Sequence, residues 1–120
     1  MHNYRELKIW QRSINVTVDV YKVTSVFPVD ERYGLTSQVR RAVVSVASNI
    51  AEGAGRNTNG EFIHFLGISI GSSFEVVTQL IIAKELQLVS EESIEPILRE
   101  LDELQKMTYG FIETLKNSNR

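Results

Sequence analysis

The chain has 120 residues, of which 42% are hydrophobic and 23% are charged, and it contains no cysteine. This length suffices for one domain with a core of its own, and the absence of cysteine excludes disulfides and thiolate metal sites and favours a cytoplasmic location. The net charge of -2 argues against a dedicated nucleic-acid binder. The chain has no apolar run of about 18 residues, so no membrane span is expected. Charged residues near its start interrupt any apolar segment of a secretory signal.

The first half of the chain has the hydrophobic periodicity of two helices. The first helix is expected at residues 4–25 and ends before Pro28, because proline disfavours a helical conformation in the residue that precedes it. The second helix is expected at residues 35–52, and Gly53 follows it as the residue that ends the helix. No strand-like alternation competes with this pattern, so the sequence predicts an all-α fold.

A third helix is expected at residues 58–87, because Thr58 and Glu61 have the spacing of a capping box at its start. A helix that begins in this way has its first backbone N–H groups satisfied by the threonine side chain. The sequence therefore marks the start of this helix more clearly than its end.

The start of the fourth helix, expected at residues 93–116, depends on one proline. With Ser93 as N-cap, Pro96 falls in the first turn, where it removes no hydrogen bond of the helix. The alternative is a cap at Ser90 and one short turn before a kink. Four helices joined by short turns predict an antiparallel up-down four-helix bundle, which occupies residues 1–120 as one domain.

Two of the predicted helices carry apolar residues on more than one face. In the first helix, Trp10, Ile14 and Val18 share one face, and further apolar residues lie on roughly the opposite face. A helix in a monomeric bundle needs only one apolar face, so we interpret the second faces as an oligomer surface, with a wide core stripe as the alternative. The residues assigned to this surface are Ile9, Val16, Val20, Val23, Phe65, Ile68 and Val76.

Two glycines stand four residues apart within the predicted third helix. Gly67 and Gly71 each destabilise a helix interior by about 1 kcal/mol relative to alanine. Another backbone is therefore expected to approach closely there, and a neighbouring helix of the same bundle is the simpler interpretation.

Polar residues gather on one side of the second helix, away from its core stripe. Arg41, Ser45 and Asn49 are spaced so that they can form a hydrogen-bonded line with Glu52, in which arginine donates and glutamate accepts. A solvated face is the alternative. Arg40 points elsewhere, and the sequence leaves open which of the two arginines faces outward.

The stretches YRELKIWQRSI, FPVDERYGLTSQVRRAVVSVASNIAEGAGR and EFIHFLGISIGSSFEV are long and specific. They resemble the 23S rRNA intervening-sequence protein family, also called the four helix bundle proteins, from Tyr4 to about Val89. The resemblance implies a bacterial protein that folds as an up-down four-helix bundle and assembles into a homopentameric ring. It implies no enzymatic activity, because none is established for this family.

The positions that match the family motif include a polar set with two interpretations. In the one we favour, the set is a buried network between helices or protomers that fixes the geometry of the ring. In the other, it lines a site for RNA or for a protein partner. The set consists of Gln38, Arg41, Ser45, Asn49, Glu52 and Glu75.

No residue is assigned to catalysis, to a cofactor or to a metal, because Glu61 and His64 form only half of a di-iron motif. The sequence therefore predicts a non-enzymatic, homo-oligomeric interaction or scaffold protein. The alternative is an RNA-binding protein that uses a basic patch on the first two helices, since residues 1–56 carry a net charge of +3. Its candidate phosphate contacts are Arg5, Lys8, Arg12, Arg40, Arg41 and Arg56.

Overall fold

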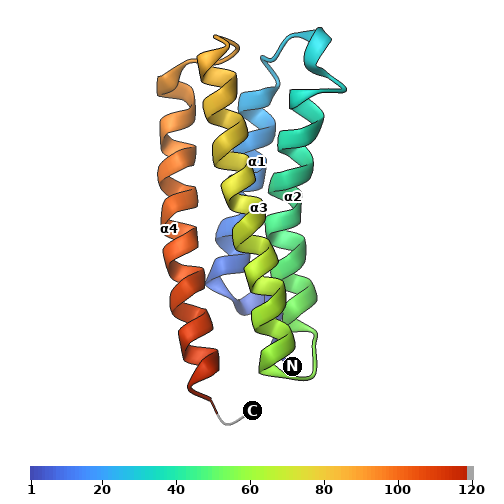
Figure 1. The fold of residues 1–120 in the computed structure, drawn as a ribbon, viewed down its shortest axis with the longest axis vertical. Coiled ribbons are helices and arrows are strands. Elements are labelled where there is room, and N and C mark those ends of the chain that lie inside the picture. The colour runs from blue at the N-terminus through green and yellow to red at the C-terminus, as the bar shows by residue number, and fades with distance from the viewer. Residues whose placement is uncertain (119–120) are drawn as a thin grey trace.

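A computed structural model describes residues 1–118, which form four long helices and no strand. The chain rises along the first helix, descends along the second, rises along the third and descends along the fourth (Figure 1). The helical segments are a 3₁₀ turn η1 (Tyr4–Glu6), α1 (Lys8–Thr24), a second turn η2 (Val29–Glu31), α2 (Leu35–Ala54), α3 (Asn59–Glu85) and α4 (Glu91–Lys116).

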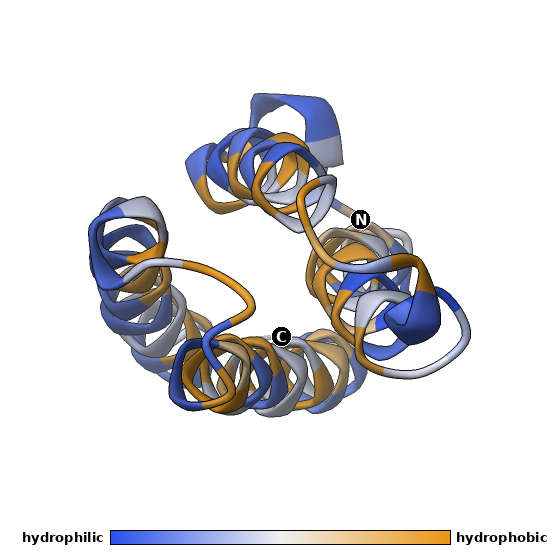
Figure 2. Ribbon diagram, turned by 90° about the horizontal axis from the view of Figure 1, so that it is seen from above, coloured by the Kyte–Doolittle hydropathy of each residue, from blue (hydrophilic) through white to orange (hydrophobic). Residues whose placement is uncertain are grey.

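Each helix packs against two others, and α2 and α3 share the most extensive contact. Seen from above, the four helices surround a common centre (Figure 2). The core there is built of aliphatic side chains and one aromatic ring, all removed from water, which is the main source of stability in such a fold. The largest fully buried residues are Val16, Val20, Val39, Val43, Val46, Ile50, Phe62, Leu66, Leu80, Ile94, Leu101 and Leu104.

The first long helix begins later than residue 4. Tyr4–Glu6 form the separate turn η1, and Leu7 after it is extended, with φ of -75° and ψ of 124°. The turn is capped by Asn3, whose Oδ1 accepts a hydrogen bond from the backbone N–H of Arg5 at 3.2 Å. Its position brings the Tyr4 ring edge-on to Trp10, with ring centroids 5.1 Å apart.

The second helix continues past Glu52 to Ala54, so the expectation that Gly53 ends it is wrong. Gly53 is buried inside the last turn, and Gly55 is the C-terminal cap instead. The third helix begins as predicted, because Thr58 Oγ1 accepts a hydrogen bond from the backbone N–H of Glu61 at 3.1 Å. It ends at Glu85, two residues before the predicted end.

The fourth helix begins at Glu91, so the expected cap at Ser93 is wrong. Ser90 is the N-cap, and its Oγ accepts a hydrogen bond from the backbone N–H of Ser93 at 3.1 Å. Pro96 lies inside the helix, where it removes one backbone donor. Pro96 is exposed near the start of the helix, so water can reach that part of the backbone.

The predicted oligomer face is wrong for most of its residues. Ile9 and Val76 are buried in the core with Val16 and Val20. Val23 and Phe65 are half-buried, and only Ile68 is exposed. The buried side of α1 also holds Ser13 and Thr24, whose hydroxyls donate to carbonyls of the same helix, which explains how these polar residues enter the core.

The opposite face of α1 is the one that water reaches. Ile14, Val18 and Tyr21 are 37%, 47% and 41% exposed, although their spacing is as apolar as that of the buried face. The prediction of two apolar faces on this helix is therefore confirmed, but the buried face and the exposed face are exchanged.

The third helix is apolar around much of its circumference. It is long and apolar enough to cross a membrane, but the core helix of a bundle has the same length and composition. Ser69 donates to the backbone carbonyl of Val46 at 2.8 Å, and Ser73 accepts from Gln105 at 2.9 Å. These bonds join α3 to α2 and α4, as expected of a helix packed among others.

Candidate functional site

A groove between α2 and α3 collects much of the predicted polar set. This polar groove has a volume of about 550 Å³ and contains Gln38, Arg41, Ser45 and Glu75. Asn49 and Glu52 lie further along α2 and do not line it. Its complete lining is Tyr33, Ser37, Gln38, Arg41, Ala42, Ser45, Ser72, Glu75 and Gln79.

Hydrogen bonds at one end of the polar groove join the two helices. The hydroxyls of Ser45 and Ser72 are 2.8 Å apart, and Asn49 Nδ2 donates to Ser45 Oγ at 2.9 Å. Within the described residues, the side chain of Arg41 makes no hydrogen bond or ion pair, and Glu52 pairs with Arg56 at 3.4 Å. The predicted polar line is therefore present only around Ser45 and Asn49.

The two adjacent arginines of α2 have different surroundings. Arg40 Nε donates to Thr24 Oγ1 at 2.9 Å, and its Nη2 donates to the Tyr21 carbonyl at 3.2 Å. The same guanidinium lies over the Tyr21 ring, 4.6 Å from its centroid. Arg40 thus fastens α2 to the end of α1, whereas Arg41 is the arginine that faces outward.

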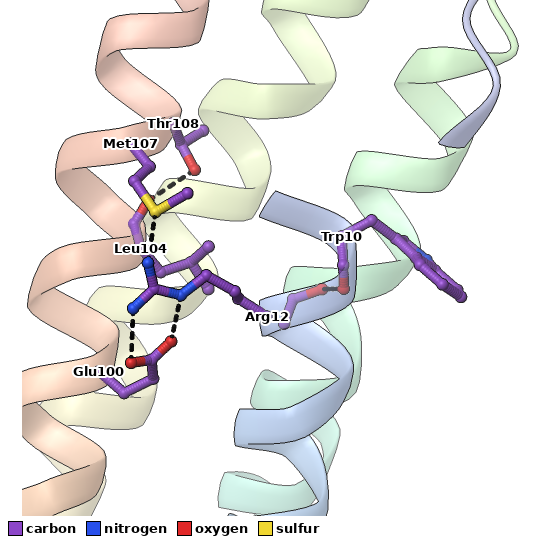
Figure 3. A network of polar contacts seen from close by, with 7 residues as sticks. Trp10, Arg12, Glu100, Leu104, Met107 and Thr108 are labelled. Atoms are coloured by element: carbon purple, nitrogen blue, oxygen red, sulfur yellow. Dashed lines mark hydrogen bonds and ion pairs between the residues drawn. The ribbon is translucent and has the colours of Figure 1, made fainter. Parts of the chain in front are cut away.

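Arg12 is also occupied within the protomer. Its Nε and Nη2 donate to the two carboxylate oxygens of Glu100 at 2.7 and 2.8 Å, and Nη1 lies 2.9 Å from the sulfur of Met107 (Figure 3). The bond to Glu100 raises the pKa of Arg12 above its ordinary value, so the guanidinium stays charged. Trp10 points to the other side of α1 (Figure 3).

The six predicted phosphate contacts do not form one patch. Arg5 belongs to η1 and Lys8 to the start of α1, whereas Arg56 lies in the connection between α2 and α3. Arg40 and Arg41 belong to the first turns of α2, at the upper end. Since Arg12 and Arg40 are already bound within the chain, the predicted patch is reduced to separate cations.

A second groove adjoins the polar groove and shares Arg41 with it. This arginine groove, about 510 Å³ in volume, lies between the end of α1, the connection that follows it and the first turns of α2. It holds three arginines and two tyrosines, and no acidic residue lines it. Its lining is Tyr21, Arg32, Tyr33, Thr36, Ser37, Arg40, Arg41 and Val44. Sequence reasoning assigned none of Tyr21, Arg32 and Tyr33 to a site. Arg32 and Tyr33 lie in a connection without helical periodicity.

A third groove runs between the lower parts of α1 and α2. This apolar groove of about 380 Å³ is lined by the Tyr4 and Trp10 rings and by small or aliphatic side chains. Exposed Ile14 and Val44 lie on its two sides. Its complete lining is Tyr4, Trp10, Ile14, Thr17, Val44, Ala47, Ser48 and Ala51.

The outward side of α3 is a second apolar surface, here called the α3 outer face. It consists of Ile68, Phe74, Ile81 and Ile82, which are 40–48% exposed. Gly67 and Gly71 lie on the same side by helical spacing, and a Cβ built on either would meet nothing within 4 Å. The expectation that a neighbouring helix of the bundle covers these glycines is therefore wrong.

In the described part of the chain, no group of three or more acidic or histidine side chains is placed to hold a metal ion. Glu61 and His64 are both exposed on α3. Glu61 is engaged with Thr58, whose hydroxyl donates to its carboxylate at 3.1 Å. The arrangement is a helix cap rather than a ligand pair.

Comparisons with known proteins identify a similar solved fold and, separately, the family. A solved structure described as a protein with unknown function from the S23 ribosomal protein family of Bacteroides thetaiotaomicron superposes with a TM-score of 0.78 at 20% identity. The alignment covers 87% of this chain and 97% of that one. A comparison with curated proteins finds no match. Residues 5–110 match the family described as 23S rRNA-intervening sequence protein, and the chain belongs to that family.

Proposed function

We propose that this protein is a non-enzymatic interaction module of the cytoplasm, an antiparallel up-down bundle whose copies assemble into a closed homo-oligomeric ring. The observation that carries the proposal is the presence of two separate apolar surfaces on one protomer, the apolar groove and the α3 outer face. Exposed apolar surfaces that gather over a helix face are typical of contacts between proteins. The five-fold ring is the arrangement that the family resemblance implies.

A hollow on one protomer and a helix face on another are surfaces of the kinds that can pack together. The apolar groove is a hollow between α1 and α2, with Trp10 at one side and the small residues Ala47 and Ala51 on its α2 side. The α3 outer face lies along one helix and carries Phe74, which is 48% exposed. The open backbone at Gly67 and Gly71 allows another helix to approach closely, which offsets the cost of two glycines in a helix.

The position of the two surfaces favours a ring over a two-fold dimer. The groove lies between α1 and α2, and the outer face belongs to α3, whose neighbours in the bundle are α2 and α4. A contact between unlike patches is heterologous, and repeated around an axis it gives a closed ring where the rotation closes and an open filament where it does not. The closed form is the one that the family resemblance implies. In a closed ring every protomer uses both of its apolar surfaces, and no apolar surface of this kind remains exposed.

The experiment that tests this proposal measures molar mass by light scattering over a range of protein concentrations. Ile14→Glu places a charge in the apolar groove, and Phe74→Glu places one on the α3 outer face. Both variants are expected to be folded monomers, whereas the parent chain is an oligomer. Val29→Glu, at an exposed valine of η2 outside both surfaces, is the matched control and is expected to remain an oligomer. A monomeric parent chain, or variants that assemble normally, would contradict the proposal.

RNA binding is the second candidate function, and the arginine groove is the observation that favours it. Of the residues predicted to contact phosphates, Arg40 and Arg41 line this groove, and Arg32 joins them. The groove thus concentrates positive charge on a chain whose net charge is -2. The test is binding of labelled rRNA hairpins across a salt series, in which steep weakening with salt indicates contacts to phosphates. No binding at low salt by the folded protein would remove this candidate.

A further inference from the structure

We propose that the arginine groove binds single-stranded nucleic acid, with phosphates on Arg32 and Arg41 and a base stacked on Tyr33. The inference rests on the second candidate function, RNA binding, and assigns to it a site and a form of ligand. The groove differs from the predicted basic patch, because it excludes Arg5, Lys8, Arg12 and Arg56 and includes residues that precede α2.

The electrostatics of the groove favour an anion. Arg32 and Arg41 are exposed, and neither forms an ion pair with any residue from 1 to 118. Arg40 between them is held by Thr24 and Tyr21, so it adds positive charge from a fixed position. Glu75 lines the polar groove on the far side of Arg41, but its carboxylate is not within ion-pair distance of that guanidinium.

The aromatic side chains of the groove favour a ligand with planar rings. Tyr33 is 89% exposed, so its ring packs against nothing that would explain a large aromatic side chain at this position. Tyr21 also lines the groove, with the Arg40 guanidinium over its ring. Exposed aromatic rings beside cations are the arrangement by which proteins bind single strands, because each base can stack on a ring while phosphates contact the cations.

The exposed ring of Tyr33 favours a single strand over a duplex as the ligand of the groove. A base must leave its own stack before it can lie on the Tyr33 ring, and a loop or a single strand allows this at little cost. The hydroxyls of Thr36 and Ser37 lie along the same groove and can donate to phosphate or base oxygens. The groove, about 510 Å³ in volume, is largely open to solvent, so a strand can reach it from outside.

Assembly strengthens a weak groove. In a cyclic ring, symmetry places the arginine groove of every protomer on the same face, so one strand can contact several grooves in succession. Linked sites bind far more tightly than one site, even when each contact is modest. A monomeric variant is therefore expected to bind the same strand more weakly and still through Tyr33.

The test is fluorescence anisotropy with a labelled oligouridine of about 12 nucleotides, long enough to span more than one groove. Tyr33→Ala is expected to weaken binding about tenfold, whereas Tyr33→Phe retains the ring and binds normally. The double substitution Arg32→Gln and Arg41→Gln is expected to reduce the slope of log K against log salt by about 1.4, as for two phosphates. Arg99→Gln, at an exposed arginine of α4, is the matched control and leaves both quantities unchanged.

The outcomes separate the groove from the function on which it rests. If the parent protein binds and the Tyr33 and arginine variants bind equally well, RNA binding stands and the groove is overturned. If the parent protein does not bind at low salt, both are overturned. Equal affinity for a duplex of the same length, or for polyglutamate, would also overturn the proposal, since neither ligand offers an unstacked base. The DNA strand of equivalent sequence supports the proposal if its binding also depends on Tyr33.

Discussion

A Cβ atom built on Gly53 would lie 2.8 Å from Cδ1 of Phe62, and equally close to Cβ of Phe65. Carbon atoms in folded proteins do not approach one another so closely without movement of the backbone. The glycine therefore allows the end of α2 to lie against the start of α3, which are the two helices in most extensive contact. Its role is close packing of two helices, and not the end of one.

Gly53→Ala is accordingly expected to destabilise the protein. Alanine improves helix propensity by about 1 kcal/mol, but a methyl group forced against two phenylalanines costs about 1–3 kcal/mol, so the free energy of unfolding should fall. Urea unfolding followed by circular dichroism measures the difference. Gly110→Ala is the control, because a Cβ at Gly110 meets nothing within 4 Å and should stabilise the exposed helix. Equal stabilisation by both substitutions would contradict the close contact at Gly53.

The glycines and the apolar faces show what the sequence could and could not predict. Periodicity located all four helices within a few residues, and Thr58 marked the start of α3 correctly. The role of Gly53 could not be read from its own helix, because it depends on the distance to Phe62 in another element. The faces of α1 were exchanged for a similar reason, since both are apolar and only the neighbouring helices decide which is buried.

Arg12 and Glu100 form the clearest ion pair between α1 and α4. The pair is bidentate, but the side chains are 35% and 31% exposed, so solvent screens part of the attraction. A double-mutant cycle with Arg12→Ala and Glu100→Ala should give a coupling free energy of about 0.5–1 kcal/mol that falls with added salt. Arg12→Lys should recover little of it, because an ammonium cannot bind both oxygens in this planar geometry.

The pair of Lys106 and Asp102 provides the comparison for that cycle. It lies within α4, and its side chains are 71% and 63% exposed. Its coupling free energy should be smaller than that of Arg12 and Glu100. If the two couplings are equal, the bidentate contact stabilises the protomer no more than an exposed ion pair does.

Substitution of the adjacent arginines of α2 should have unequal effects on the stability of the protomer. Arg40→Ala removes the bonds to Thr24 and Tyr21 and the contact with the Tyr21 ring, and is expected to destabilise the chain by about 1–2 kcal/mol. The Arg41 side chain bonds to no other residue in the described range 1–118. Arg41→Ala should therefore change the free energy of unfolding by less than about 0.5 kcal/mol. Thermal unfolding of the two variants measures this difference, and a larger loss for Arg41→Ala would contradict it.

The polar set was harder to interpret from the sequence than the core. Helical spacing correctly placed Ser45 beside Asn49, because residues four apart share a face. Glu52 and Arg56 are also four residues apart, but Arg56 lies beyond the predicted end of the helix, so this pair was not expected. Helical spacing could not show that Arg41 lies between two grooves, because this depends on the connection before α2. Two of the groove residues missed by sequence reasoning, Arg32 and Tyr33, lie in that connection.

A mixture of two monomeric variants tests whether assembly is heterologous. Ile14→Glu damages the apolar groove and leaves the α3 outer face intact, whereas Phe74→Glu does the reverse. In a head-to-tail contact, the intact groove of one variant accepts the intact face of the other, and both remaining surfaces are blocked. An equimolar mixture should therefore form a heterodimer and nothing larger, which native mass spectrometry resolves when one variant is isotope-labelled. In a two-fold contact that joins like patches, each variant would instead retain one intact patch and form a homodimer without its partner. Homodimers in the separate samples would thus exclude the head-to-tail ring, and a heterodimer found only in the mixture would support it.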